Sequence, residues 1–125
     1  MARILVVDDD PGFAYAVARH LRADGHEVVV CAGPIEALVE LESTRTIDML
    51  VSDVRLPVGT PHGFSLGRMA KLRRPDLPVL FMTGHPEVIQ HDRTPPGPVM
   101  FKPFEMTDLG AAVLARLGER PRHRL

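Results

Sequence analysis

Side chains that could bind a metal ion or a phosphate group follow apolar runs at four points of the chain. They are Asp8 and Asp9 after residues 4–7, Asp53 after 47–52, Thr83 after 78–82 and Lys102 after 99–101. Short runs of branched apolar residues are typical of buried parallel strands. Because the carboxyl ends of parallel strands share one edge of a sheet, we expect these side chains to converge on one cleft.

Carboxylates gathered in one cleft repel one another, and this repulsion predicts a bound cation. Two carboxylates ~4 Å apart repel by about 4 kcal/mol at an effective dielectric constant of about 20. Hard oxygen ligands in a partly open site favour Mg²⁺, whose charge together with that of Lys102 neutralises the acids. An arriving phosphoryl group adds oxygens that the metal, Lys102 and the Thr83 hydroxyl can share. The residue types therefore predict phosphoryl transfer, which depends on positioning and charge neutralisation.

Each of these residues also has a simpler interpretation when it is taken singly. Asp10 before Pro11 is typical of a helix N-cap, Asp8 and Asp9 of turn residues as much as of ligands, Asp53 of a loop acid, Thr83 before Gly84 of a turn, and Lys102 of a surface lysine. Their convergence at one edge of a sheet favours a functional site over these separate structural roles.

The apolar pattern predicts strands that alternate with helices. The strands are expected at residues 4–7, 27–31, 47–52, 78–82 and 99–101, and the helices at 11–24, 34–42, 64–73, 87–91 and 106–117, with a loop of turn residues at 56–63. The fourth helix is expected to be short because several prolines surround it. This alternation predicts an α/β protein, with a doubly wound parallel sheet in a three-layer α/β/α domain.

Several apolar side chains are expected to face the core of this domain. They are Phe13, Val17 and Leu21 in the first helix, Ile35, Leu38 and Leu41 in the second, Leu109, Val113 and Leu117 in the last, and Phe81, Met82, Met100 and Phe101 in the last two strands. The single Cys31 lies in an apolar run and is expected to be a small core residue in a reducing cytoplasm. No two histidines have helical i, i+4 spacing, so no transition-metal site is predicted.

Composition indicates one globular domain. The chain has 125 residues, of which 45% are hydrophobic and 25% charged, and these ordinary values indicate neither a disordered nor a membrane-spanning protein. No apolar run approaches ~18 residues, and no signal peptide is predicted. The formal net charge of −1 gives no electrostatic reason to expect nucleic-acid binding. We expect the domain to cover residues 1–118, followed by a basic tail or linker stub at residues 119–125.

The motif set resembles that of the receiver domains of two-component response regulators. The resemblance is carried by the acidic pair Asp8-Asp9, by Asp53 with its proline loop, by Thr83-Gly84 and by Lys102-Pro103-Phe104, and it covers essentially the whole chain. It implies a flavodoxin-like sheet with the strand order 2-1-3-4-5. It also implies a signalling protein that is not an enzyme, apart from phosphorylating and dephosphorylating itself.

The resemblance also implies a role for each residue of the cleft. Asp53 would accept a phosphoryl group from the phosphohistidine of a histidine kinase or histidine phosphotransfer protein. A Mg²⁺ ion would be held by the carboxylates of Asp8, Asp9 and Asp53 and by the backbone carbonyl of Arg55. Lys102 would pair with Asp53 or the phosphoryl group, Thr83 would hydrogen-bond the phosphoryl oxygens, and the Lys102-Pro103 bond would be cis. We expect a cytoplasmic monomer or weak dimer, with an unknown output partner and no contact with membranes or nucleic acid.

The sequence departs from the family pattern in the region that usually carries the output. Val99 stands three positions before the lysine, where the family usually has an aromatic switch residue. The loop after Asp53 is about two residues longer than usual, and the segment from Thr83 to Lys102 is about three residues shorter. The usual coupling of Thr83 to an aromatic ring is therefore not expected, and the output surface should be unusual.

Two alternative functions remain open from the sequence. Asp8-x-Asp10 has the spacing of the nucleophile and general acid in haloacid-dehalogenase-type phosphatases, which would make Asp8 the nucleophile. Pro11 and Gly12 replace the expected continuation of that motif, and no later Gly-Asp acidic motif is present. The other alternative is an interaction module that keeps the receiver fold without being phosphorylated.

Overall fold

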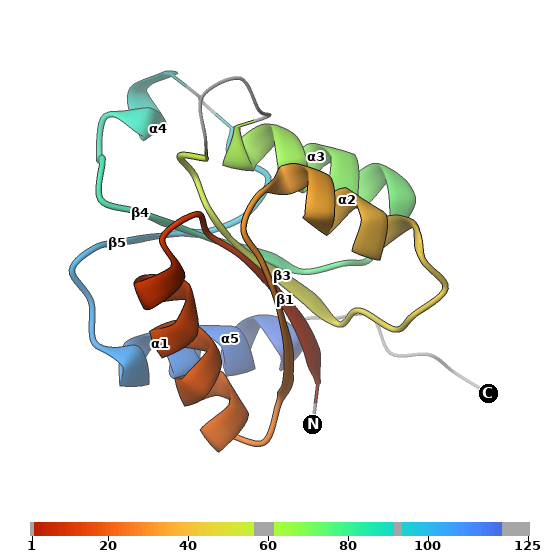
Figure 1. Cartoon of the computed structure of the whole chain (residues 1–125). Helices are drawn as coiled ribbons and strands as arrows, with labels where there is room; N and C mark the ends of the chain where they lie inside the picture. The colour runs from red at the N-terminus through yellow and green to blue at the C-terminus, as the bar shows by residue number, and fades with distance from the viewer. Residues whose placement is uncertain (1, 57–61, 92–93, 119–125) are drawn as a thin grey trace.

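A computed structural model of the chain shows one parallel sheet between two layers of helices (Figure 1). The structure describes residues 2–56, 62–91 and 94–118. The strands are β1 (Arg3–Val7), β2 (Glu27–Cys31), β3 (Met49–Asp53), β4 (Val79–Thr83) and β5 (Val99–Phe101), and the helices are α1 (Pro11–Ala23), α2 (Pro34–Glu42), α3 (Gly63–Arg73), α4 (Val88–His91) and α5 (Met106–Gly118). These bounds confirm the expected elements. Much of the loop predicted after Asp53 (57–61) and the basic tail (119–125) lie outside the described residues.

The strand order is β2-β1-β3-β4-β5, and every pair of neighbouring strands is parallel. This confirms the order that the resemblance implied. In the register of the sheet, Val7 lies opposite Ser52, Asp53 opposite Met82, and Thr83 opposite Phe101. The ends of β1, β3, β4 and β5 therefore meet at one edge of the sheet, which we call the carboxyl edge.

Both faces of the sheet are buried under helices. Figure 1 shows α1 and α5 on one face and α2 and α3 on the other. Successive residues of β1 alternate between the two cores, as the pleat of a strand requires, with Ile4 and Val6 on the α1/α5 side and Leu5 on the α2/α3 side. None of the helices that the structure describes is both long and apolar enough to cross a lipid bilayer.

Two apolar residues expected in the core are instead exposed. Ile35 is 61% exposed, because the side of α2 that packs on the sheet is formed by Pro34, Ala37 and Leu41. A residue two positions before Ala37 points to the opposite side of the helix. Phe101 is 42% exposed because β5 is a short edge strand with only one neighbour. The remaining residues that we expected in the core are buried or half-buried.

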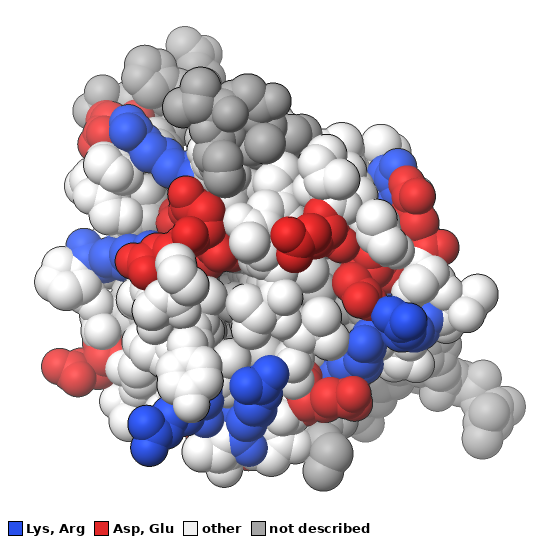
Figure 2. Space-filling view, viewed as in Figure 1, with Lys and Arg blue, Asp and Glu red and all other residues white. Residues whose placement is uncertain are grey.

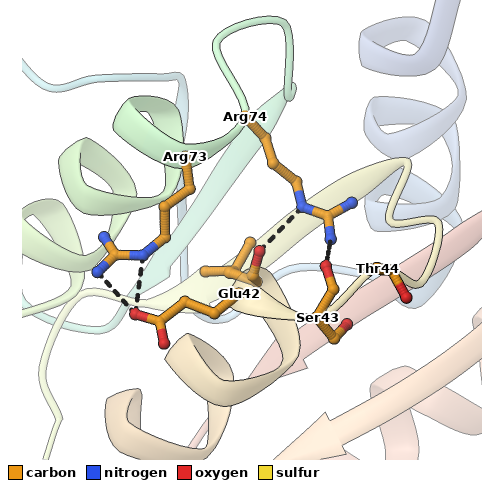
Figure 3. Close-up of a pocket in the computed structure, with 6 residues that line it drawn as sticks. Glu42, Ser43, Thr44, Arg73 and Arg74 are labelled. Atoms are coloured by element: carbon orange, nitrogen blue, oxygen red, sulfur yellow. Dashed lines mark hydrogen bonds and ion pairs between the residues drawn. The ribbon is translucent and has the colours of Figure 1, made fainter.

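The ends of α2 and α3 are joined at the other edge of the sheet by two arginines, which line a shallow hollow there (Figure 3). Arg73 donates from Nε and Nη2 to one oxygen of Glu42 at 3.0 and 2.8 Å. Arg74 donates to the carbonyls of Leu41 and Ser43 at 3.2 and 2.8 Å. These carbonyls belong to the last turn of α2 and its cap, which cannot be satisfied within the helix. The arginines in this hollow therefore hold helices together.

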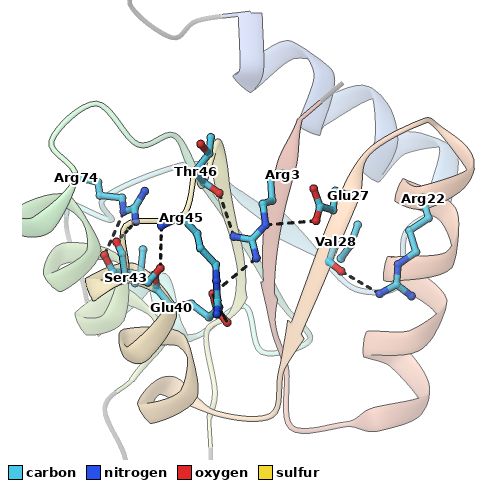
Figure 4. Close-up of polar contacts among 10 residues, drawn as sticks. Arg3, Arg22, Glu27, Val28, Glu40, Ser43, Arg45, Thr46 and Arg74 are labelled. Carbon is cyan, nitrogen blue, oxygen red and sulfur yellow. Dashed lines mark hydrogen bonds and ion pairs between the residues drawn. The ribbon is translucent and has the colours of Figure 1, made fainter.

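Arg3 has a similar role at the start of β1 (Figure 4). Its guanidinium donates to the Thr46 carbonyl at 3.0 Å and lies 3.6 Å from Glu27 and 3.8 Å from Glu40. Strand β1 is thus linked to β2, to α2 and to the segment that leads into β3. These polar contacts lie at the edge opposite to the residues of the expected cleft.

Gly63, the first residue of α3, lies against the end of β3. Its amide donates to the Val54 carbonyl at 2.8 Å. A Cβ added to Gly63 would lie 2.7 Å from Val54 Cα and would collide with the carbonyl oxygen of Asp53. Only glycine allows this close approach between the helix and the strand that carries Asp53.

We predict that Gly63→Ala lowers the free energy of unfolding by about 1–3 kcal/mol, because the added methyl group must displace backbone atoms. Urea denaturation followed by circular dichroism measures this change. Gly118→Ala is the control, since among the described residues no atom outside the neighbouring backbone of its own helix lies within 4 Å of a Cβ at that position, and it should change stability by less than about 0.5 kcal/mol. Equal stabilities of Gly63→Ala and the wild-type protein would contradict the close approach.

Candidate functional site

Asp8 and Asp9 follow β1 at the carboxyl edge of the sheet. The Asp8 amide donates to the Cys31 carbonyl at 3.1 Å, which extends the pairing with β2 and fixes the backbone. The Asp8 residue is 2% exposed, whereas Asp9 is exposed. One Asp8 oxygen, Oδ1, accepts from the Asp10 amide at 2.9 Å. The other, Oδ2, is buried and accepts no hydrogen bond from the described residues, so it depends on positive charge nearby.

Asp53 is the last residue of β3 and lies beside these acids. Its side chain is 14% exposed, and its Oδ1 accepts from the Arg55 amide at 3.3 Å. The carboxylate oxygens of Asp8, Asp9 and Asp53 lie within 4.8 Å of one another. In the part of the chain that the structure describes, no other group of His, Cys, Asp and Glu side chains is arranged to hold a metal ion. Figure 2 shows acidic atoms gathered on the surface near the start of α1.

Lys102 follows β5 and provides a positive charge beside two of the acids. Its amide donates to the Thr83 carbonyl at 2.8 Å. Its Nζ lies 3.4 Å from Asp53 Oδ2 and 3.6 Å from Asp8 Oδ2. The bond between Lys102 and Pro103 is cis, as expected. One ammonium group faces three carboxylates, so the acidic group keeps an excess of negative charge.

Burial raises the pKa of the Asp8 carboxyl above its ordinary value, and the neighbouring Asp53 carboxylate raises it further. The hydrogen bond from the Asp10 amide and the charge of Lys102 act in the opposite direction, but they do not cancel these effects. The three acids offer the hard oxygen ligands that Mg²⁺ prefers, and within the described part of the chain the buried Oδ2 of Asp8 accepts no hydrogen bond. These residues therefore fit a magnesium site.

Thr83 ends β4 at the same edge and is fully buried. Its Oγ1 accepts from the His85 amide at 3.0 Å, and the hydroxyl proton can still be donated to another oxygen. Asp10 has only the structural role that the sequence allowed: its Oδ1 accepts from the amides of Gly12 and Phe13 at 3.0 and 3.2 Å and caps α1.

Val99 lies where the family usually has an aromatic residue. It is half-buried opposite Phe81 in the sheet and packs into the α2/α3 core. The Phe81 ring is held edge-on by Phe64, with the ring centroids 4.8 Å apart. The aromatic group beside Val99 is therefore a fixed part of the core.

Two features near the cleft were not predicted from the sequence. Phe13 was expected only in the core, but Lys102 Nζ lies 4.1 Å from the centroid of its ring. Glu87 lies 3.2 Å from Arg55 and 3.3 Å from His85, and so links the segments that follow β3 and β4. Arg55 and His85 each follow a site residue by two positions, which is the only signal in the sequence for the second feature.

Cys31 has the structural role expected for it. It is 3% exposed. Burial raises the pKa of its thiol to about 11, with further contributions from Glu36 and Glu40. The thiolate is the reactive form of cysteine, so this residue is inert at neutral pH.

The parallel five-stranded sheet with acids and a lysine at its carboxyl edge is the arrangement expected of a signalling receiver. The family model for the response regulator receiver domain matches residues 4–114, and this chain belongs to that family. Receiver domains are signalling modules of two-component systems and not enzymes.

Individual proteins agree with this assignment. The chain is 35% identical over 85 residues to the DNA-binding transcriptional regulator NtrC of Escherichia coli, covering 68% of this chain but only 18% of NtrC. A response regulator receiver protein from Sinorhizobium medicae superposes with a TM-score of 0.87 at 26% identity, covering 96% of this chain and 97% of that one. The BeF3-activated DrrB receiver domain gives a TM-score of 0.81 at 26% identity, covering 95% and 99%.

We predict that Asp8→Asn stabilises the metal-free protein and removes its stabilisation by Mg²⁺. The amide keeps an acceptor for the Asp10 amide but carries no buried charge. Because the folded state raises the Asp8 pKa, deprotonation costs stability as the pH rises above the ordinary value of 3.8. The melting temperature without metal should therefore rise by about 3 °C at neutral pH, and the gain should shrink as the pH falls toward 4.

Thermal denaturation with and without millimolar Mg²⁺ measures both effects. Asp76→Asn is the matched control, since Asp76 is an exposed acid between α3 and β4, and it should leave both melting temperatures unchanged. A Mg²⁺-dependent rise in the Asp8→Asn protein equal to that of the wild type would contradict the proposed metal ligand.

Proposed function

We propose that this chain is a phosphoacceptor receiver in which Asp53 takes a phosphoryl group from a phosphohistidine. The observation that carries the proposal is the position of the Asp53 carboxylate, 3.4 Å from Lys102 Nζ and within the group of three acids. The phosphohistidine belongs to a histidine kinase or a histidine phosphotransfer protein. The phosphorylated and unphosphorylated forms then differ in their affinity for an output partner.

In the proposed reaction, an Asp53 carboxylate oxygen attacks phosphorus and forms the acyl phosphate bond. The phosphorus–nitrogen bond breaks, and its electron pair returns to the imidazole of the donor histidine. Lys102 lies where it can pair with the added phosphoryl oxygens, and the Thr83 hydroxyl can donate to one of them. Mg²⁺ held by Asp8, Asp9, Asp53 and the Arg55 carbonyl would supply positive charge to the phosphoryl oxygens.

The output of this receiver is proposed to differ from the usual family pattern. Val99 supplies no aromatic ring that could change position with Thr83, and α4 has only four residues (Val88–His91). Phosphorylation would then act on partner binding through the segments that follow β3 and β4, where Glu87 links Arg55 to His85. The buried Cys31 thiol is compatible with the cytoplasmic location expected for such a protein.

The geometry argues against the phosphatase alternative. In that reading Asp8 is the nucleophile and Asp10 the general acid, yet the Asp8 side chain is fully buried. The Asp10 carboxylate is used to cap α1. Neither group is placed for its role, because the nucleophile must reach the substrate and the acid must reach the leaving group.

We predict that acetyl phosphate and Mg²⁺ phosphorylate the wild-type chain at Asp53, and that Asp53→Asn abolishes the modification, since an amide is a far weaker nucleophile. Intact-protein mass spectrometry detects the phosphoryl group and peptide mapping locates it. The chain has no tryptophan, so ¹⁹F NMR of beryllofluoride provides the binding measurement. Asp10→Asn is the matched control, because asparagine retains the cap, and it should still be phosphorylated.

Other outcomes distinguish the alternatives. Phosphate on a residue other than Asp53 would refute the proposal. Hydrolysis of phosphate monoesters that is lost in Asp8→Asn but kept in Asp53→Asn would establish the phosphatase. If the chain neither binds Mg²⁺ nor becomes phosphorylated, the result would favour the alternative of an interaction module that is not phosphorylated. Phosphotransfer from a panel of purified histidine kinases then identifies the donor.

A further inference from the structure

The ring of Phe13 lies beside the ammonium group of Lys102. Phe13 is half-buried in the first turn of α1, and Lys102 Nζ lies 4.1 Å from the centroid of its ring. The Phe13 amide donates to Asp10 Oδ1 at 3.2 Å, so the helix cap fixes the backbone that carries the ring. No step of the proposed phosphoryl transfer uses this side chain.

A second aromatic side chain restrains the ring. Phe104 follows Lys102 by two residues and packs edge-on against Phe13, with the centroids 6.0 Å apart and the ring planes at 73°. Both side chains are half-buried against the α1/α5 core. The Phe13 ring is therefore held between α1 and the segment that joins β5 to α5, and it cannot turn away from Lys102 without losing this contact.

Among the described residues, the Lys102 ammonium group has three attractive neighbours, which are the carboxylates of Asp53 and Asp8 and the uncharged ring of Phe13. Its Nζ lies 3.4 Å from Asp53 and 3.6 Å from Asp8, and its side chain is 24% exposed. An aromatic face attracts an ammonium group, more strongly where water is partly excluded. A further carboxylate at this position would add to the repulsion among the acids, whereas the ring adds attraction without adding charge.

We propose that Phe13 is a positioning residue that holds the Lys102 ammonium group toward Asp53, so that it is already in place when the phosphoryl group arrives. This inference rests on the proposed function and extends it. A lysine side chain has a flexible four-carbon stem joined by rotatable bonds, and fixing it costs conformational entropy. The Phe13–Lys102 contact meets part of this cost before the reaction, which is how preorganised charges assist phosphoryl transfer.

The test measures beryllofluoride affinity by ¹⁹F NMR in the presence of Mg²⁺, together with the rate of phosphorylation by acetyl phosphate. Phe13→Leu keeps an apolar side chain of similar size but removes the aromatic face. We expect it to weaken beryllofluoride binding and to slow phosphorylation by about threefold to tenfold. The Mg²⁺ affinity measured without beryllofluoride should stay within about twofold, because Phe13 supplies no ligand.

Three further measurements separate positioning from packing. Phe13→Tyr keeps an aromatic face, and its beryllofluoride affinity and phosphorylation rate should therefore equal those of the wild type. Tyr15→Leu removes a 62% exposed ring from the same helix and should change neither. In ¹³C-edited NMR spectra of the unphosphorylated protein, the signals of the methylene next to Lys102 Nζ should carry a ring-current shift that is lost in Phe13→Leu.

Wild-type affinity and rate in Phe13→Leu would overturn the positioning role and leave the proposed function intact. A loss of affinity without any change in the Lys102 signals, or a loss that Phe13→Tyr does not recover, would also overturn it, since packing alone would then explain the effect. If the wild-type chain itself neither binds beryllofluoride nor accepts phosphate, the proposed function fails, and the positioning role fails with it.

Discussion

The repulsion among the carboxylates of Asp8, Asp9 and Asp53 is the constraint on which the site depends. Their oxygens lie within 4.8 Å of one another, one of the acids is buried, and a single ammonium group, that of Lys102, balances part of their charge. Such an arrangement lowers the stability of the metal-free protein and raises its affinity for a cation. Like charges held this close together, one of them buried, are typical of a site that binds a cation or carries out chemistry.

The rest of the structure holds these acids in place. Both faces of the sheet are buried, so β1 and β3 cannot separate to relieve the repulsion without exposing apolar surface. The edge opposite to the site is cross-linked by Arg3, Arg73 and Arg74. Contacts that hold the helices together and side chains suited to chemistry are thus found at opposite ends of the strands, as is general for open α/β sheets.

The aromatic side chains near the site do not occupy the position where receivers usually have an aromatic switch residue. The usual switch position has Val99, and the ring of Phe81 beside it is fixed in the α2/α3 core by Phe64. The ring that contacts Lys102 is instead that of Phe13, which packs against Phe104 on the α1/α5 side. The aromatic contact with Lys102 therefore comes from the side of the sheet opposite to Phe81, and from a ring held in place by packing.

The order of elements and the convergence of the acids, Thr83 and Lys102 were predictable from the sequence, because short apolar runs that end in polar residues specify parallel strands and their carboxyl edge. The exposure of Ile35 and Phe101 was not, since it depends on how α2 is rotated and on β5 lying at the edge of the sheet. The three acids that follow β1 also show what the sequence predicts and what only the tertiary structure decides. Their residue types and spacing predicted that they bind a metal ion or cap a helix. Only the tertiary structure assigned the helix cap to Asp10 and buried Asp8 beside Lys102. Distances between side chains from different strands are set by packing, which no local pattern in the sequence records.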